Sequence, residues 1–339
     1  MTAPAANYRG MSSRASDANA PSMTHRILIA EPLDFCPEAV RILRSAGEVT
    51  LRGTDRAGLA DALREFDVVW FRLAHRIDRE MIDRATRCRI LATPVTGLDH
   101  IDLTGCAERG VRVISLRGET DFLRQVRGTA ELTLALALAL LRRIPAAAAH
   151  VLGGGWDRDQ FRGRELFGHT VGLVGVGRLG QIVAGYFRGL GMDVIGYDPR
   201  PDFPHESARR VDSLGELLAH ADVVSLHVSY DGSTRHLLGS TELAAMKPGA
   251  ILINTSRGGV VDDRALLHAL EEGRIAGAAL DVLDGEPNIG TEHPLVAYAR
   301  RHGNLLIVPH IGGNTVESFA KTEIFLAGKV VEALRSAAC

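Results

Sequence analysis

The sequence predicts an α/β protein built from two doubly wound parallel-sheet domains with a cleft between them. Short apolar runs alternate with helical patterns along nearly the whole chain, as in parallel strands whose two faces are covered by helices. A glycine-rich turn at residues 175–180 stands between a buried-strand pattern and a helical one. The length of 339 residues leaves room for roughly two domains.

Five apolar runs in the first third of the chain predict the strands of the first sheet. These strands are expected at residues 27–30, 48–51, 68–71, 90–95 and 111–115, and the helices between them at 37–45, 56–65, 79–86 and 101–109. Residues 116–128 then interrupt the alternation with charges and glycines. A long Ala/Leu-rich helix is predicted over residues 129–149. Because its apolar residues surround the helix axis, we expect it in the core or in a subunit interface.

The alternation of strands and helices resumes in the second half of the chain. Strands are expected at residues 170–176, 194–197, 223–228, 251–255, 276–282 and 305–308, and helices at 179–190, 240–246, 262–272 and 315–336. The last of these helices is long enough to return to the first domain.

The turn at residues 175–180 has the G-x-G-x-x-G spacing of dinucleotide-binding sites. Gly175 permits a tight turn, Gly177 lets a pyrophosphate approach the backbone, and Gly180 lets helix and strand pack closely. The N–H groups at the start of the helix, at Arg178 and Leu179, are expected to face the phosphates. With a strand before it and a helix after it, this turn predicts a dinucleotide site.

Asp198 is the acidic residue expected to bind the ribose of that dinucleotide. It follows the apolar run 194–197 and lies 18 residues after Gly180. A carboxylate at this point can accept both ribose hydroxyls of an adenosine, and it would repel a 2′-phosphate. The sequence therefore favours NAD over NADP as the cofactor.

These patterns divide the chain into two domains and a leader. We expect an NAD-binding Rossmann domain over residues 127–312, and a flavodoxin-like substrate-binding domain over residues 23–126 together with 313–339. Residues 1–22 are rich in Ala, Ser, Asn and Pro and have no apolar stretch. They are predicted to be a disordered leader.

Composition narrows the range of partners and compartments. The chain has 39 Lys and Arg against 41 Asp and Glu, so its net charge of −2 offers no field for nucleic acid or an acidic membrane surface. No apolar run is long enough to span a bilayer. Lysine occurs at only three positions, so anion recognition would fall to arginine. The four cysteines are far apart, which favours reduced thiols in a cytoplasmic protein and no metal site.

Three polar residues follow the ends of predicted strands in the second domain. Arg257, Glu286 and His310 come after the strands that end at residues 255, 282 and 308. Ligands of open parallel sheets bind at this edge. A histidine can give a proton to a carbonyl oxygen whose carbon receives a hydride, a nearby carboxylate stabilises the protonated imidazole, and arginine can bind a carboxylate with two hydrogen bonds. Each residue alone also fits a structural or solvated role, but the three together favour a dehydrogenase site.

Over about residues 25–335 the chain resembles the D-isomer-specific 2-hydroxyacid dehydrogenase family. The resemblance is carried by TGLDHID at residues 96–102, TAE at 129–131, the glycine turn, and the segments around Arg257, Glu286 and His310. It implies that Arg257 holds the substrate carboxylate and that Glu286 pairs with His310, the acid/base. It also implies that Asp281 orients the nicotinamide carboxamide. Further matches are the cofactor-lining residues His227, Thr234 and Thr255, and the substrate-loop residues Arg72, Val95, Thr96 and Gly97.

The chain also departs from the family pattern. Residues 227–234 read HVSYDGST where the family has H-x-P-L-T-x-x-T. The resemblance therefore does not determine which contacts this loop makes. The segment 116–128 is longer than expected and carries charged residues that include Arg117, Glu119, Arg124 and Arg127. It either reshapes the substrate pocket or is a hinge loop with solvated charges. The formate dehydrogenase branch, which has Gln at the position of Glu286, is disfavoured.

Together, the sequence patterns and the resemblance predict a cytoplasmic, NAD-dependent, homodimeric enzyme that interconverts a D-2-hydroxyacid and its 2-keto acid. Arginines at positions 72, 76, 117, 124 and 127 leave open a phosphonate, phosphite or phosphorylated substrate. An NAD-sensing binding protein, like the corepressors that share this fold, is the alternative outside the enzymes. The complete Arg, Glu and His set argues against that alternative.

Overall fold

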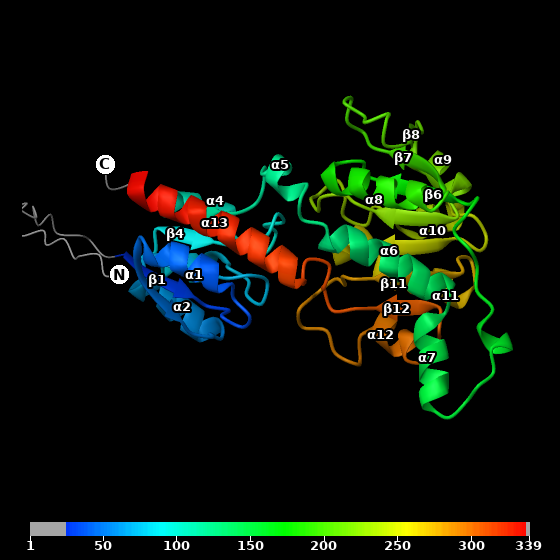
Figure 1. The fold of residues 1–339 in the computed structure, drawn as a ribbon, viewed down its shortest axis with the longest axis horizontal. Helices are drawn as coiled ribbons and strands as arrows, with labels where there is room; N and C mark the ends of the chain where they lie inside the picture. The colour runs from blue at the N-terminus through cyan, green and yellow to red at the C-terminus, as the bar shows by residue number, and fades with distance from the viewer. Residues whose placement is uncertain (1–24, 337–339) are drawn as a thin grey trace, which may run out of the picture.

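The computed structural model describes residues 25–336, which form two α/β domains lying side by side (Figure 1). Within this range each domain has one parallel sheet, and a cluster of buried apolar residues packs against each face of each sheet. The predicted fold class is thereby confirmed. The leader predicted at residues 1–22 lies outside the described residues.

The first sheet has the strand order β2-β1-β3-β4-β5, and all its neighbouring strands are parallel. Its elements are β1 (His25–Ile29), α1 (Pro37–Arg44), β2 (Gly47–Leu51), α2 (Arg56–Glu65), β3 (Val68–Trp70), α3 (Arg79–Asp83), β4 (Ile90–Ala92), α4 (Leu103–Glu108) and β5 (Arg112–Ile114). This order is the flavodoxin-like one. Every residue of β3 and β4 is buried, which is why these strands appear in the sequence as continuous apolar runs.

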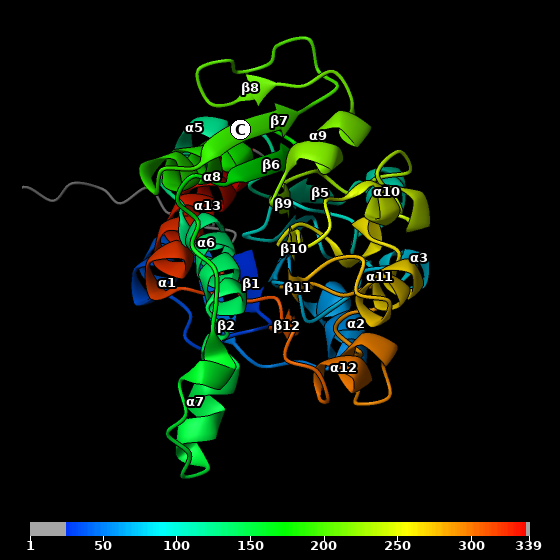
Figure 2. The same ribbon diagram turned by 90° about the vertical axis from the view of Figure 1, so that its right-hand side faces the viewer.

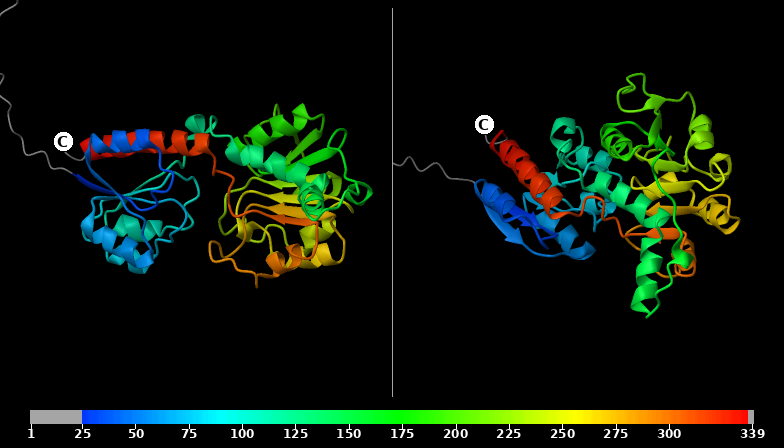
Figure 3. Two further views of the ribbon diagram at one scale, coloured as in Figure 1. Left: turned by 60° about the horizontal axis from the view of Figure 1, so that its bottom comes forward. Right: turned by 45° about the vertical axis from the view of Figure 1, so that its right-hand side comes forward.

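Helix α13 (Val316–Ser336) returns the end of the chain to the first domain and lies beside α1 (Figure 3). Leu326, Ala327 and Val330 on this helix are fully buried in the core between α1 and the first sheet. The domain boundaries predicted at residues 126/127 and 312/313 remain a prediction.

The second sheet has the order β12-β11-β10-β9-β6-β7-β8, again with parallel neighbours. Its strands are β6 (Thr170–Val174), β7 (Asp193–Tyr197), β8 (Arg209–Arg210), β9 (Val223–Leu226), β10 (Ile251–Asn254), β11 (Gly277–Leu280) and β12 (Leu305–Ile307). Its helices are α6 (Gly128–Leu141), α8 (Arg178–Gly189), α9 (Leu214–His220), α10 (Ser240–Ala245), α11 (Asp263–Glu271) and α12 (Pro294–Ala299). The order reverses between β6 and β9, and ligands of such sheets bind at that switch point.

The single helix predicted over residues 129–149 is wrong, because the structure has two helices there. Helix α6 ends at Leu141, and α7 (Ile144–Leu152) begins after Arg143, which has a left-handed backbone conformation with φ of 54°. Pro145 is in the first turn of α7, where proline is tolerated although it would break a continuous helix. In the described range no single helix is long and apolar enough to cross a membrane. Only residues 120–141 taken together with α7 reach that length and composition, and this pair is bent by 63°.

Several short elements between residues 114 and 300 were not predicted from the sequence. They are the helices α5 (Thr120–Leu123), α9 and α12, the two-residue strand β8, and the 3-10 turns at Asp159–Phe161 and Gly258–Val260. Each spans at most seven residues, too few to give a clear period in the sequence.

The linker segment 116–128 lies against α13 in the first domain. Phe122 of α5 stacks on Phe325 with ring centroids 3.9 Å apart, Lys321 Nζ donates to the carbonyl of Gln125 at 3.0 Å, and Lys329 pairs with Glu119. Some hydrophobic and charged side chains of this segment therefore pack on α13. No residue of the segment is among those that line the cavity described below.

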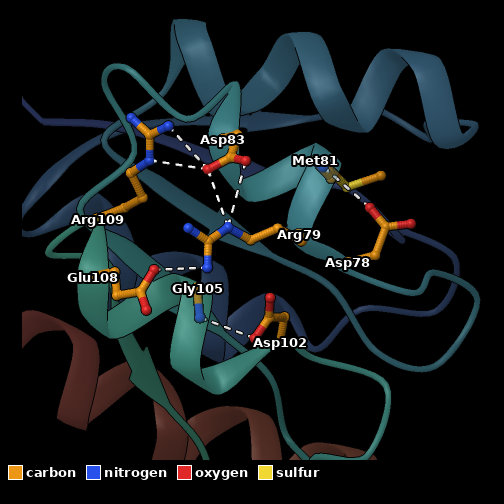
Figure 4. A network of polar contacts seen from close by, with 8 residues as sticks. All are labelled: Asp78, Arg79, Met81, Asp83, Asp102, Gly105, Glu108 and Arg109. Atoms are coloured by element: carbon orange, nitrogen blue, oxygen red, sulfur yellow. Dashed lines mark hydrogen bonds and ion pairs between the residues drawn. The ribbon is translucent and has the colours of Figure 1, made fainter.

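A network of polar contacts fixes the turn that follows β4 (Figure 4). Arg79 of α3 pairs with Glu108 of α4 at 2.6 Å, and Asp83 pairs with Arg109 at 2.9 Å. The N-cap carboxylates Asp78 and Asp102 accept backbone N–H groups of Met81 and Gly105, at 3.1 and 2.9 Å. The helices that flank the turn are thus held to each other, and the turn at residues 98–101 faces the second domain from a fixed base.

Candidate active site

The three predicted strand-end residues lie together in one cavity of about 1080 Å³. Arg257, Glu286 and His310 follow β10, β11 and β12, which are neighbours in the second sheet. Because parallel strands end at the same edge, residues far apart in sequence meet there. The opposite wall of the cavity comes from the first domain, through residues 73–76 and 99–100.

His310 and Glu286 form a pair, with Nδ1 of the imidazole 2.9 Å from Oε1 of the carboxylate. Both side chains are about one quarter exposed. His310 has a left-handed backbone with φ of 54°, and its N–H donates to the carbonyl of Asp281 at 2.8 Å. With Nδ1 committed to Glu286, Nε2 is the ring nitrogen able to exchange a proton with a bound molecule.

Asp281 is buried beside this pair and fixes the loop that carries His310. Its carboxylate accepts the N–H groups of Ile311 at 2.6 Å and Gly312 at 2.9 Å. Burial raises the pKa of Asp281 to about 6. A Cβ on Gly312 would lie 2.8 Å from Asp281 Oδ2, so this close approach depends on glycine. Asp281 is therefore a positioning residue in this structure.

Arg257 links the second domain to the first. Its Nε donates to Asp99 Oδ1 at 3.1 Å, and its Nη1 donates to the carbonyl of Ser256 at 2.9 Å. Burial of Asp99 acts to raise its pKa, but the Arg257 guanidinium outweighs it and the net pKa is lowered. A Cβ on Gly97 would lie 1.7 Å from Nη2 of Arg257, so Gly97 leaves the space that the guanidinium occupies. Within residues 25–336, Nη2 has no hydrogen-bond partner and remains able to bind an anion.

The glycine turn follows β6 at the switch point and has the shape expected for a dinucleotide. Gly175 has φ of 90°, and a Cβ on Gly180 would lie 2.3 Å from the carbonyl oxygen of Gly175. A Cβ on Gly177 would meet only a guanidinium nitrogen of Arg200, at 3.8 Å. Helix α8 begins at Arg178, followed by Leu179, so its free N–H groups adjoin this open backbone. These residues fit the pyrophosphate of a dinucleotide.

Asp198 lies at the end of β7 with its carboxylate directed at the turn. Its Oδ2 accepts the N–H of Val176 at 2.9 Å, and Arg200 forms a two-pronged pair with it. Burial of Asp198 opposes ionisation, yet the Arg200 guanidinium and the two backbone donors leave its pKa lowered. The carboxylate is therefore ionised but already paired, which the sequence did not reveal.

The three remaining cofactor-lining predictions fall around the same edge of the sheet. The carbonyl of His227 packs against Gly175, and the imidazole Nε2 of His227 is 2.9 Å from Ser225 Oγ. Thr234 Oγ1 donates to the carbonyl of Ser229 at 2.7 Å and so closes its own loop. Thr255 is buried, with its hydroxyl 2.9 Å from that of Thr133 on α6. Their roles toward a cofactor remain predictions.

The predicted substrate-loop residues are only partly at the cavity. Arg72 is paired with the fully buried Glu323 of α13, and its guanidinium lies over the ring of Phe319 at 4.3 Å. Neither it nor Val95 or Thr96 lines the cavity, and Val95 instead accepts the N–H of Leu116 through its carbonyl. Gly97 touches the site through its contact with Arg257.

Arg76, which the sequence predicted only as a contact to a phosphorylated substrate, lines the cavity, and the site prediction missed two further cavity residues of the first domain, Asp99 and His100. Asp99 and His100 belong to the TGLDHID segment, so that motif contained the available signal. Burial lowers the pKa of His100 to about 4, and its Nε2 has no hydrogen-bond partner among the described residues. His100 therefore presents a neutral, unpaired ring nitrogen. Over residues 25–336 the structure contains no group of three or more His, Cys, Asp or Glu side chains arranged for a metal ion.

Comparison with known proteins identifies the relatives of this chain. A sequence model of "D-isomer specific 2-hydroxyacid dehydrogenase, NAD binding domain" matches residues 134–312. D-3-phosphoglycerate dehydrogenase of Methanocaldococcus jannaschii is 35% identical over 91% of this chain and 57% of its own length. Glyoxylate reductase of Thermococcus litoralis is 38% identical over 78% of this chain and 79% of its own length. The chain thus spans little more than half the length of the first of these relatives.

A solved structure has the same overall fold. D-lactate dehydrogenase of Aquifex aeolicus, complexed with NAD and lactic acid, has a TM-score of 0.79 and 29% identity, and the match covers 92% of this chain and 96% of that one.

Proposed function

Because the chain belongs to the D-isomer specific 2-hydroxyacid dehydrogenase family, we propose that it interconverts a D-2-hydroxyacid and its 2-keto acid with NAD as redox partner. The observation that carries this proposal is the shared cavity of Arg257, Glu286 and His310 at the carboxyl edge of the NAD-binding domain. The glycine turn and Asp198 lie on the same sheet and would hold the dinucleotide.

Each of the three residues has a distinct task in this proposal. The bound cofactor supplies a hydride to the keto carbon in reduction and accepts one in oxidation. Arg257 binds the substrate carboxylate, beginning with the Nη2 that has no partner among the described residues. His310 gives the proton from Nε2 to the carbonyl oxygen, and Glu286 stabilises the charged imidazole and fixes its orientation.

The test is the loss of NADH absorbance with a panel of 2-keto acids that includes glyoxylate, hydroxypyruvate and pyruvate. We expect at least one to be reduced to the D-2-hydroxyacid. If NADH binds but no keto acid is reduced, and a protein partner binds with an affinity that follows NADH, the chain is an NAD-sensing binding protein instead.

A second substrate class is supported by the charges that line the cavity. Arg76 from the first domain and Arg300 and Arg301 from the end of α12 lie on its walls, in addition to Arg257. A phosphorylated, phosphonate or phosphite substrate would pair with these guanidinium groups. Including such compounds in the same panel distinguishes the two classes.

The exposed apolar residues of α7 support a homodimer. Leu152 is 89% exposed and Trp156 just beyond the helix is 90% exposed, while Ile144 and Val151 are about half exposed. Helix α7 extends away from the rest of the chain (Figure 2). An apolar arm of this kind is stabilised by burial against a second copy. The cytoplasmic location expected from the cysteines remains part of this proposal.

A further inference from the structure

Asp198, the residue expected to bind the adenosine ribose, has no lone pair left for it. Its Oδ1 accepts from the Arg200 backbone N–H at 3.1 Å and from Arg200 Nε at 2.9 Å. Its Oδ2 accepts from the Val176 N–H at 2.9 Å and from Arg200 Nη2 at 2.8 Å. A carboxylate offers about four acceptor positions, and all of them are filled here.

The Arg200 side chain therefore stands between Asp198 and any ribose. Two of the four hydrogen bonds come from its guanidinium, and they are the two that a ribose diol would need. The same guanidinium lies 3.8 Å from the position of a Cβ on Gly177, next to the backbone that approaches the pyrophosphate. Half of the Arg200 side chain is exposed, so it is free to turn away from Asp198.

The charge at this position also differs from that of a bare carboxylate. Arg210 on β8 donates to the carbonyls of Asp198 at 3.5 Å and Arg200 at 3.3 Å, and its guanidinium lies over the Phe203 ring at 5.3 Å. Asp202 is the other carboxylate that acts on Arg200. Two guanidinium groups thus balance two carboxylates where repulsion by Asp198 alone would exclude a 2′-phosphate.

We propose that Arg200 is a specificity-determining residue that lets the adenosine end of the site accept a 2′-phosphate as well as a ribose diol, so that this chain binds NADP(H) alongside NAD(H). Arginine beside the ribose is the group that accommodates a 2′-phosphate in dinucleotide folds. With NAD(H), the Arg200 guanidinium moves away from Asp198, and the Asp198 carboxylate accepts the ribose hydroxyls. With NADP(H), the guanidinium pairs with the phosphate. This inference rests on the proposed dinucleotide site.

Removal of the Arg200 side chain has opposite effects on the two ligands. In R200A the 2′-phosphate loses its cationic partner and meets an Asp198 carboxylate that keeps only its two backbone donors. Its binding therefore weakens by about tenfold or more, the effect of one lost charge-assisted hydrogen bond. The unphosphorylated ribose no longer has to displace a guanidinium, so its binding is unchanged or tighter. A purely structural role for Arg200 would weaken both ligands together.

The experiment is calorimetric titration of the full chain with ADP-ribose and with its 2′-phosphate, which requires no turnover. The wild-type protein should bind both, and R200A should lose only the phosphorylated ligand. R200K, which keeps the charge, should bind the phosphorylated ligand more tightly than R200A. R209A is the matched control, because it removes the same charge as R200A. Arg209 precedes Arg210 on β8, and neighbouring side chains on a strand point to opposite faces, so Arg209 points away from the side on which Arg210 contacts Asp198 and Arg200. R209A should behave like wild type.

Wild-type protein that binds ADP-ribose but not its 2′-phosphate overturns the inference and leaves the proposed function intact. Equal weakening of both ligands in R200A, with the fold retained by circular dichroism, overturns it as well. Failure of wild-type protein to bind either ligand would instead contradict the dinucleotide site itself, and with it the proposed function.

Discussion

Single residues of this site are held by contacts that a ligand must keep or replace. The Nδ1 of His310 is committed to Glu286, and Asp281 fixes the two residues that follow His310. Arg257, by contrast, donates a hydrogen bond from Nε to Asp99 of the other domain. The imidazole is thus preset, whereas the guanidinium is shared between the domains.

At His310 we expect H310Q to lower turnover by about 10²–10⁴-fold, because glutamine cannot give or take the proton. NADH affinity should stay within a few-fold of wild type, since the imidazole does not touch the glycine turn. H220Q, an exposed histidine on α9, is the control and should leave both quantities unchanged. Steady-state kinetics and NADH titration provide the measurement. Undiminished turnover in H310Q would remove His310 from the proposed role.

Because the His227 imidazole is buried, we expect it to lower the free energy of unfolding at acid pH. Burial lowers the pKa of His227 from 6.5 to about 3, and Nδ1 has no partner in the described part of the chain. Between these values the unfolded chain binds a proton that the folded protein does not, so stability is lost as pH falls from 6.5 toward 3. The loss is at most one proton, or about 1.4 kcal/mol per pH unit.

We therefore expect H227N to have a shallower decline of unfolding free energy over that pH range than wild type. Urea denaturation at a series of pH values measures this. Parallel curves for the two proteins would mean that His227 is protonated in the folded state.

At the scale of elements, the turn between β6 and α8 depends on one close approach. A Cβ on Gly180 would lie 2.3 Å from the Gly175 carbonyl oxygen, whereas a Cβ on Gly185 of the same helix meets nothing within 4 Å. G180A should cost about 1–3 kcal/mol of stability through overpacking and weaken dinucleotide binding by about tenfold or more. G185A should instead raise stability by about 0.5–1 kcal/mol with binding unchanged. Equal dinucleotide affinity in the two variants would contradict the assigned role of the turn.

Elements also show where sequence reasoning succeeds and where it stops. The strand ends and the glycine turn were predictable because their signals are local and parallel strands bring their ends to one edge. The pair of Arg72 with Glu323 joins residues 251 positions apart, and no local pattern encodes that contact. The break between α6 and α7 did have a signal in Pro145, but the uninterrupted apolar composition obscured it.

At the scale of the whole molecule, the two domains contribute opposite walls of one cavity. The proposed activity therefore depends on the position of one domain relative to the other. From the sequence, the fold class and the meeting of Arg257, Glu286 and His310 at one edge of the second sheet could be predicted. Asp99 and His100 could not be assigned to the cavity, because their place in it depends on the packing of one domain against the other.

The apolar arm predicts the assembly of the protein. We expect light scattering to give twice the 36.5 kDa mass of the chain. Leu152→Glu should shift the protein toward the monomer, because a charge would be buried at the interface of the two copies. Leu33→Glu is the matched control, since Leu33 is 78% exposed on the first domain. A monomeric wild type, or equal behaviour of the two variants, would contradict the dimer.

In the proposed reaction, a hydride moves within this cavity between a nicotinamide and the carbon next to a carboxylate. The direct measurement uses NADH deuterated on the transferred position of the nicotinamide C4, with the keto acid that the panel identifies, followed by mass spectrometry and chiral analysis of the product. We expect one deuterium on C2 of the D-2-hydroxyacid with wild-type protein and little product with H310Q. A product without deuterium on C2, or one of the opposite configuration, would contradict it.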